Sequence, residues 1–158
     1  MRPQHRYCYS TLWNFTTDLH ILNWMEAMGF EYDVLTDHDV HANGADLLRN
    51  YSVVVTSSHP EYYSTPLVNA WEEYIASGGR GMYLGGNGMY WVAVPNPDRP
   101  YIIEVRRGEQ GDQGWRAHPG ECFHSHSGEK GGLWRLRGRA AQRIWGVGYT
   151  AHAFGTSA

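Results

Sequence analysis

The sequence predicts an α/β fold in which a doubly wound, mostly parallel sheet is flanked by helices. Helix and strand patterns alternate over the first two thirds of the chain, and residues 53–55 are three valines, a run that is apolar on both faces of a strand. Glycines punctuate the ends of these elements, where tight connections need them. The 158 residues suit a single domain, with an α/β core at residues 12–95 and an irregular, glycine-rich or β part at residues 96–158.

The first third of the chain predicts two helices around one strand. Thr17–Asp18 can cap a helix that Gly29 ends, and its apolar positions recur at helical spacing, namely Leu19, Leu22, Met25 and Met28. Residues 32–36 are expected to form a short strand, with the polar residues 37–39 as its exit loop. Residues 43–49 are expected to form a short helix.

The middle of the chain predicts strand, helix and strand. Residues 52–56 read as a buried strand, and Thr65 reads as the N-cap of a helix with Pro66 at its first position. The apolar face of that helix is Leu67, Ala70, Trp71, Tyr74 and Ile75. Residues 81–84 form the next expected strand, and it leads into a glycine turn, Gly85–Gly88.

Beyond residue 95 the pattern changes. Residues 102–106 are expected to form a strand, residues 108–120 are polar and glycine-rich, and a last strand is expected within residues 142–154. We find no internal repeat and no linker that would separate two domains.

Composition excludes several classes of protein. The 13 basic residues are outnumbered by 16 acidic ones, whereas a nucleic-acid surface needs a basic excess. No apolar run approaches the roughly 20 residues of a membrane span, and no secretory signal opens the chain. Two cysteines form no disulfide framework, so we expect a reduced, cytoplasmic chain.

Polar side chains follow two of the expected buried strands. His59 and Glu61 follow the strand at residues 52–56, and Asn87 lies in the glycine turn after the strand at residues 81–84. Ligands of open parallel sheets bind beyond the carboxyl ends of the strands, so we expect Glu61 and Asn87 to share one hollow. Alternatively, Glu61 complements a helix dipole and Asn87 is a left-handed turn residue.

The glycine turn is neither a phosphate loop nor a nucleophile elbow, because it lacks the Lys-Ser/Thr ending and has Asn in place of Ser or Cys between its glycines. Further along, Cys122, His124 and His126 would form a zinc site only if their side chains converge. Glu129 is the better candidate for a carboxylate in a cleft.

Several motifs in one order give the chain a family resemblance. They are residues 32–39 (YDVLTDHD), 58–62 (SHPEY), 83–91 (YLGGNGMYW), 103–107 (IEVRR), His124, and 128–135 (GEKGGLWR). Over about residues 15–154 the chain resembles the C-terminal domain of the large (β) subunit of N,N-dimethylformamidase. The resemblance implies a fold like that of class I glutamine amidotransferases, which is also flavodoxin-like, and hydrolysis of a small N-substituted amide to a carboxylate and an amine.

The resemblance also implies a mononuclear iron held by two tyrosinates and one glutamate. Glu61 would be the metal ligand, His59 and Asn87 would lie in the active site, and Glu129 would be a further acid or base. Carboxylate and phenolate oxygens suit a hard Lewis-acidic ion, which polarises an amide carbonyl and activates water. His59 or Glu129 would carry a proton to the leaving amine.

The resemblance further implies that the ligand tyrosines of the family belong to a part upstream of this chain. Tyr7 and Tyr9 are the only tyrosines before the first expected helix, and they are poor candidates. We therefore expect a chain that is incomplete at its N-terminus, and that binds iron poorly and hydrolyses little dimethylformamide when isolated. Its expected partners are a small amide substrate and either the rest of the large subunit, a small subunit or a second copy. The alternative is a catalytically incomplete structural or interaction module that keeps the family fold.

Overall fold

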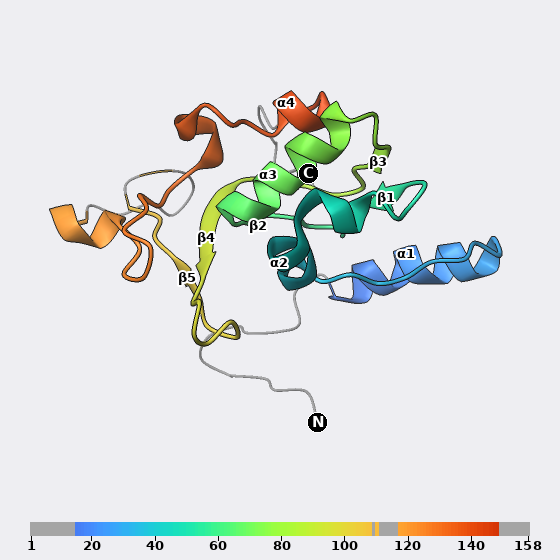
Figure 1. Ribbon diagram of the computed structural model, residues 1–158, viewed down its shortest axis with the longest axis horizontal. Coiled ribbons are helices and arrows are strands. Elements are labelled where there is room, and N and C mark those ends of the chain that lie inside the picture. The colour runs from blue at the N-terminus through green and yellow to red at the C-terminus, as the bar shows by residue number, and fades with distance from the viewer. Residues whose placement is uncertain (1–14, 109, 111–116, 149–158) are drawn as a thin grey trace, which may run out of the picture.

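The computed structural model describes residues 15–108, 110 and 117–148 (Figure 1). Its helices are α1 (Phe15–Ala27), α2 (Asp37–Leu48), α3 (Thr65–Ala76) and α4 (Gln142–Trp145), with 3-10 helices η1 (Pro119–Cys122) and η2 (Trp134–Arg137). Its strands are β1 (Val54–Val55), β2 (Tyr62–Tyr63), β3 (Gly81–Met82), β4 (Trp91–Pro95) and β5 (Ile103–Val105). None of the helices in these ranges is long and apolar enough to cross a bilayer.

Two stretches of chain run side by side in the same direction. β1 pairs in parallel with β3, and further along the same two stretches β2 pairs in parallel with β4. Between the two pairs, backbone hydrogen bonds continue from the glycine turn to the loop after β1, as in Gly86 N–H to Ser58 O (3.2 Å) and Met89 N–H to Pro60 O (3.0 Å). The loop that holds His59 and Glu61 is therefore attached to the glycine turn along its length.

Helix α3 connects the two stretches and carries much of the core. It follows β2, ends before β3, and packs against α2, α4 and β4 (Figure 1). The predicted apolar face is confirmed, since four of its five members are buried and Ile75 packs against the core. The buried core is Val40, Ala45, Leu48, Tyr63, Leu67, Val68, Ala70, Trp71, Tyr74, Met89, Val92 and Trp134.

The third strand of the larger sheet is antiparallel. β5 pairs with β4, with Val94 opposite Glu104, and lies within the strand predicted at residues 102–106. Trp134 donates its indole N–H to the carbonyls of Tyr63 in β2 and Trp91 in β4, both at 3.1 Å. These bonds fix the segment after Gly132 against the junction of β2 and β4.

The prediction of a strand at residues 32–36 is wrong. The structure has no strand there, and Thr36 is instead the N-cap of α2. The two residues form a capping box: Thr36 Oγ1 accepts the Asp39 N–H, and the Asp39 carboxylate accepts the Thr36 N–H. Residues 37–39, expected as an exit loop, form the first turn of that helix. The short helix expected at residues 43–49 is the second half of α2, which is kinked at Gly44, where φ is 67°.

Three further boundaries differ from prediction. Ser64, not Thr65, caps α3, because its hydroxyl accepts the Leu67 N–H. Residues 142–145, where the last strand was predicted to begin, form the short helix α4 instead. The rest of that predicted strand, residues 149–154, lies outside the described part of the chain. β4 was not predicted as a strand, because prolines 95, 97 and 100 read as a loop.

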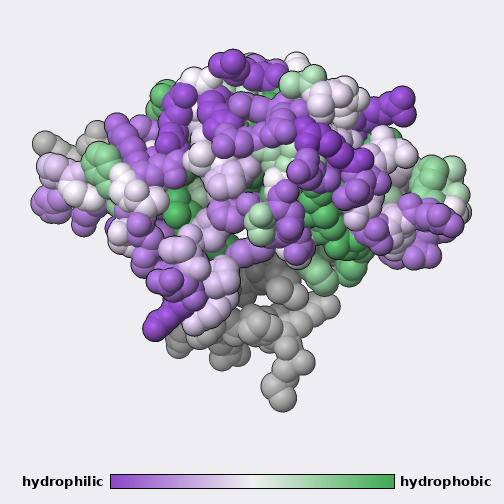
Figure 2. Space-filling model, viewed as in Figure 1, coloured by the Kyte–Doolittle hydropathy of each residue, from purple (hydrophilic) through white to green (hydrophobic). Residues whose placement is uncertain are grey.

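Helix α1 lies along one side of the molecule with no buried residue (Figure 1). Gly29 ends it as predicted, with a φ of 70°. Of the predicted apolar positions, Leu19 and Met28 are exposed, and Leu22 and Met25 are partly exposed. Neighbouring apolar side chains are exposed as well, namely Phe15, Trp24, Phe30 and Val34. Figure 2 shows apolar surface gathered on this side of the molecule.

Candidate functional site

His59 and Glu61 form a close pair in the loop between β1 and β2. Their side chains approach to 3.1 Å, between His59 Nδ1 and Glu61 Oε2, and they are only 25% and 16% exposed. The Glu61 N–H also bonds to the His59 carbonyl at 2.9 Å, so the loop turns tightly around Pro60. A carboxylate on one ring nitrogen fixes the orientation of an imidazole and leaves Nε2 to exchange a proton.

The glycine turn fits directly against this loop. A Cβ at Gly85 would lie 2.5 Å from the Ser58 carbonyl oxygen, and a Cβ at Gly88 would lie 2.6 Å from the ring of Tyr83. Beyond the turn, the Tyr90 and Trp91 N–H groups both reach the Glu61 carbonyl at 3.0 Å. The close approach of two backbones therefore explains Gly85, while Gly88 leaves room for the Tyr83 ring, and the approach sets where the Glu61 backbone lies.

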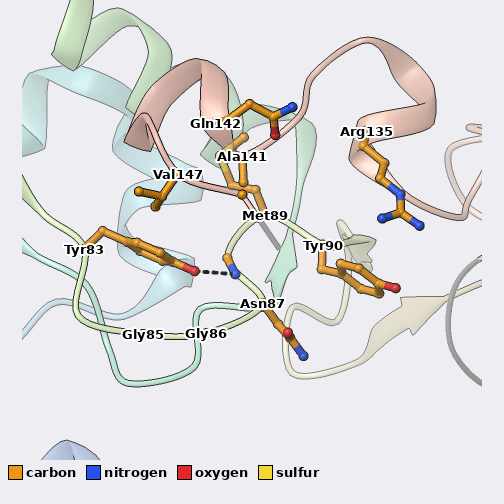
Figure 3. A pocket seen from close by; sticks show the side chains of 12 residues that line it. Tyr83, Gly85, Gly86, Asn87, Met89, Tyr90, Arg135, Ala141, Gln142 and Val147 are labelled. Carbon is orange, nitrogen blue, oxygen red and sulfur yellow. Dashed lines mark hydrogen bonds between the residues drawn. The ribbon is translucent and has the colours of Figure 1, made fainter. Parts of the chain in front are cut away.

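Asn87 lies at the rim of a cavity of about 410 Å³. Its φ of 55° is left-handed, which agrees with the alternative that Asn87 is a left-handed turn residue. Its carboxamide points away from Tyr83 and Gln142 (Figure 3). The cavity is lined by Tyr83, Gly85, Gly86, Asn87, Gly88, Met89, Tyr90, Arg135, Ala141, Gln142, Val147 and Gly148. The structure thus brings the backbones of the Glu61 and Asn87 segments together, but Glu61 and His59 are not among these lining residues.

Glu129 lies elsewhere, at the start of α3 and beside η2. It accepts hydrogen bonds from Thr65 Oγ1 at 2.6 Å and from Arg137 at 2.5 Å. Burial raises the pKa of its carboxyl, but the Thr65 hydroxyl and the Arg137 guanidinium outweigh burial and lower the pKa overall. Glu129 is therefore an ionised carboxylate at neutral pH that holds η2 against the start of α3, and its lowered pKa makes it a weak proton acceptor.

The three side chains of the possible zinc site do not converge. His124 is buried and its Nδ1 lies 3.0 Å from the Glu129 carbonyl, whereas His126 contacts Asn96 Nδ2 at 2.8 Å. Cys122 is a free thiol. Among the residues that the structure describes, no three His, Cys, Asp or Glu side chains form a group that could hold a metal ion.

This result also bears on the implied iron. Glu61 has the right chemistry for one hard oxygen ligand, but the described residues supply no set of His, Cys, Asp or Glu ligands to complete a centre around it. Tyr7 and Tyr9 lie outside the described residues.

Two residues at the site, Asp18 and Arg135, could not be predicted from the sequence to lie there. Asp18, predicted as part of a helix cap, accepts hydrogen bonds from Ser58, 40 residues away. Arg135, whose guanidinium lies 5.7 Å from the ring centre of Tyr90, reaches the cavity from η2. Both contacts are long-range, and neither leaves a periodicity or motif in a single sequence.

The comparisons with known proteins agree on one family. The family model for N,N-dimethylformamidase beta subunit-like, C-terminal, matches residues 1–158. The chain is 49% identical over 154 residues to the N,N-dimethylformamidase beta subunit of Alcaligenes sp. and 48% identical over 154 residues to that of Paracoccus aminophilus. These matches cover 98% of this chain but only 20% of each relative. The chain therefore belongs to the family of N,N-dimethylformamidase beta subunit-like C-terminal regions.

Proposed function

We propose that this chain is part of a metal-dependent amidohydrolase that cleaves a small N-substituted amide such as N,N-dimethylformamide. The observation that carries the proposal is the half-buried His59–Glu61 pair, held against a glycine turn by backbone hydrogen bonds in a member of this family. Amide hydrolysis needs a group that moves a proton from the attacking water to the leaving nitrogen. His59 supplies such a group through Nε2, while Nδ1 is engaged by Glu61.

We further propose that Glu61 contributes one carboxylate ligand to an iron ion whose other ligands lie outside the described residues. When bound, the iron supplies a Lewis acid for the amide carbonyl. The chain's own contribution is to fix the Glu61 backbone through the N–H groups of Tyr90 and Trp91, and the Glu61 side chain through His59. Asn87, which lines the cavity, is proposed as a polar group that orients substrate or water, whereas Glu129 is engaged by Thr65 and Arg137 and is not proposed as the proton acceptor.

The rest of a larger subunit is the partner that we propose for α1. The chain spans 20% of the length of its relatives, and α1 buries no residue and leaves several large apolar side chains exposed. Burial of these side chains against another part of the same subunit would contribute about 25 cal/mol for each Å² of apolar surface removed from water. We also propose that the two parallel strand pairs, linked by α3, belong to a doubly wound sheet of the glutamine amidotransferase-like type.

The test uses the complete protein that carries this chain. We expect the purified protein to release dimethylamine from dimethylformamide and to contain iron. Glu61→Gln is expected to lower kcat/KM by about 100-fold or more and to reduce the iron content, because the substitution removes the anionic ligand.

Glu73→Gln is the matched control, because Glu73 forms an exposed ion pair with Arg49 on the surface of α3. Such pairs are worth about 0–1 kcal/mol, so activity and iron content should not change. A complete protein with no amide hydrolysis, or full activity in Glu61→Gln, would contradict the proposal. The first result would favour the non-catalytic module.

A further inference from the structure

Ser58, the residue before His59, is held from two sides. Its N–H and its hydroxyl both donate to Asp18 Oδ1 of α1, at 2.8 and 2.7 Å. Its carbonyl accepts the Gly86 N–H of the glycine turn at 3.2 Å. Every polar group of Ser58 is thus bonded, and the residue joins α1, the His59–Glu61 loop and the glycine turn.

The Asp18 contact is partly buried and joins two elements that are 40 residues apart in the sequence. One carboxylate oxygen accepts both bonds. The next two backbone contacts along the loop are Met89 N–H to Pro60 O and Tyr90 N–H to Glu61 O. A shift at Ser58 would therefore be passed directly to the position of the His59–Glu61 pair.

We propose that Asp18 is a positioning residue for the hydrolytic site, acting through Ser58 on His59 and Glu61. This inference rests on the proposed function. Asp18 touches neither substrate nor reacting atoms in the proposal. Its role is to keep the two side chains in register with the glycine turn. Reaction rates are sensitive to such register, since a displacement of about 1 Å can lower a rate by roughly 100-fold.

Asp18 also lies in the first turn of α1, where an acidic side chain stabilises a helix through its dipole. The two roles are separable. Asn at position 18 loses the charge and therefore the dipole interaction, but keeps the single oxygen that accepts both Ser58 bonds. Ala loses the charge and the acceptor together.

The experiment compares Asp18→Ala, Asp18→Asn and Glu26→Ala in the complete protein. Glu26 is the matched control, because it is another hydrogen-bonded carboxylate of α1, which accepts from the Tyr32 hydroxyl at 2.9 Å. The readouts are kcat and KM for dimethylformamide, and hydrogen–deuterium exchange of residues 57–61 and 85–91. For Asp18→Ala we expect kcat to fall by about 10- to 100-fold with KM little changed, and exchange in both segments to accelerate.

Asp18→Asn should restore kcat to within about threefold of wild type, because the oxygen acceptor is retained, and Glu26→Ala should match wild type in both readouts. Equal losses in the Ala and Asn variants would overturn the inference, as would unchanged exchange in Asp18→Ala. Faster exchange with normal kcat would overturn it too, because the contact would then be structural only. If the wild-type protein hydrolyses no amide, the proposed function fails. In that case the exchange data still decide whether Asp18 holds the loop.

Discussion

At the scale of single residues, Gly85 and Gly86 make a matched pair. A methyl group at Gly85 would meet backbone, 2.5 Å from Ser58 O, whereas a methyl group at Gly86 meets nothing within 4 Å. We expect Gly85→Ala to lower the free energy of unfolding by about 1–3 kcal/mol, because the loop after β1 must move. Gly86→Ala should be neutral or stabilising by up to about 1 kcal/mol. Chemical denaturation of both variants measures the difference, and equal stabilities would show that the two backbones do not touch.

The lowered pKa of Glu129 predicts that the free energy of unfolding depends on pH. Its folded-state pKa is lowered from the ordinary 4.5, so its stabilising effect is complete above about pH 5 and is lost as pH falls through the folded-state value. Glu129→Gln removes the charge beside Arg137 and should cost about 1–3 kcal/mol at pH 7. Unfolding measured from pH 7 down to pH 3 should show the gap between wild type and variant closing at the acid end. A gap that is constant with pH would exclude the ionised pair as its source.

At the scale of elements, the start of α3 shows how the caps determine the fold. Ser64 is 6% exposed, and its hydroxyl accepts the Leu67 N–H and contacts His41 Nδ1 at 2.7 Å. We expect Ser64→Ala to lower the free energy of unfolding by about 1–2 kcal/mol, because a buried helix N–H loses its partner. Ser77→Ala at the other end of α3 is the control, since its hydroxyl donates to the Tyr74 carbonyl, and it should cost less than about 0.5 kcal/mol. Thermal unfolding of the two variants compares them, and an equal effect would argue against the cap.

Elements with a strong local signal could be predicted from the sequence, and elements decided by distant contacts could not. α3 has both an apolar face and a proline at its start, so its place and its buried side were predicted, with an error of one residue at the cap. Residues 32–36 contain β-formers, but the capping box of Thr36 and Asp39 starts a helix where an exit loop was expected. β4 contains the β-formers Trp91, Val92 and Val94, but it ends at Pro95, and the prolines that follow read as a loop. Its parallel partner β2 comes from a distant part of the chain.

The same distinction applies to the candidate site. The adjacency of the His59–Glu61 loop and the glycine turn follows from parallel pairing of two apolar segments, and sequence reasoning anticipated it. The partners of the side chains could not be predicted, because they depend on long-range contacts. Asp18 of α1 accepts the Ser58 hydroxyl, and Glu129 forms an ion pair with Arg137.

At the scale of the whole molecule, the exposed face of α1 makes a prediction about assembly. Met28 is 60% exposed at the end of this helix, so a lysine there is tolerated locally and even complements the helix dipole. If another part of the subunit covers α1, Met28→Lys in the complete protein will place a charge in an apolar contact, at a cost of a few kcal/mol. Limited proteolysis should then release the region that contains this chain faster than in wild type. Leu136→Lys, at a side chain 62% exposed in η2, is the control and should leave the digestion rate unchanged. Equal rates in the two lysine variants would contradict a covered α1, because Met28 and Leu136 are about equally exposed in this chain and only coverage of α1 by the rest of the subunit is expected to make position 28 the more sensitive.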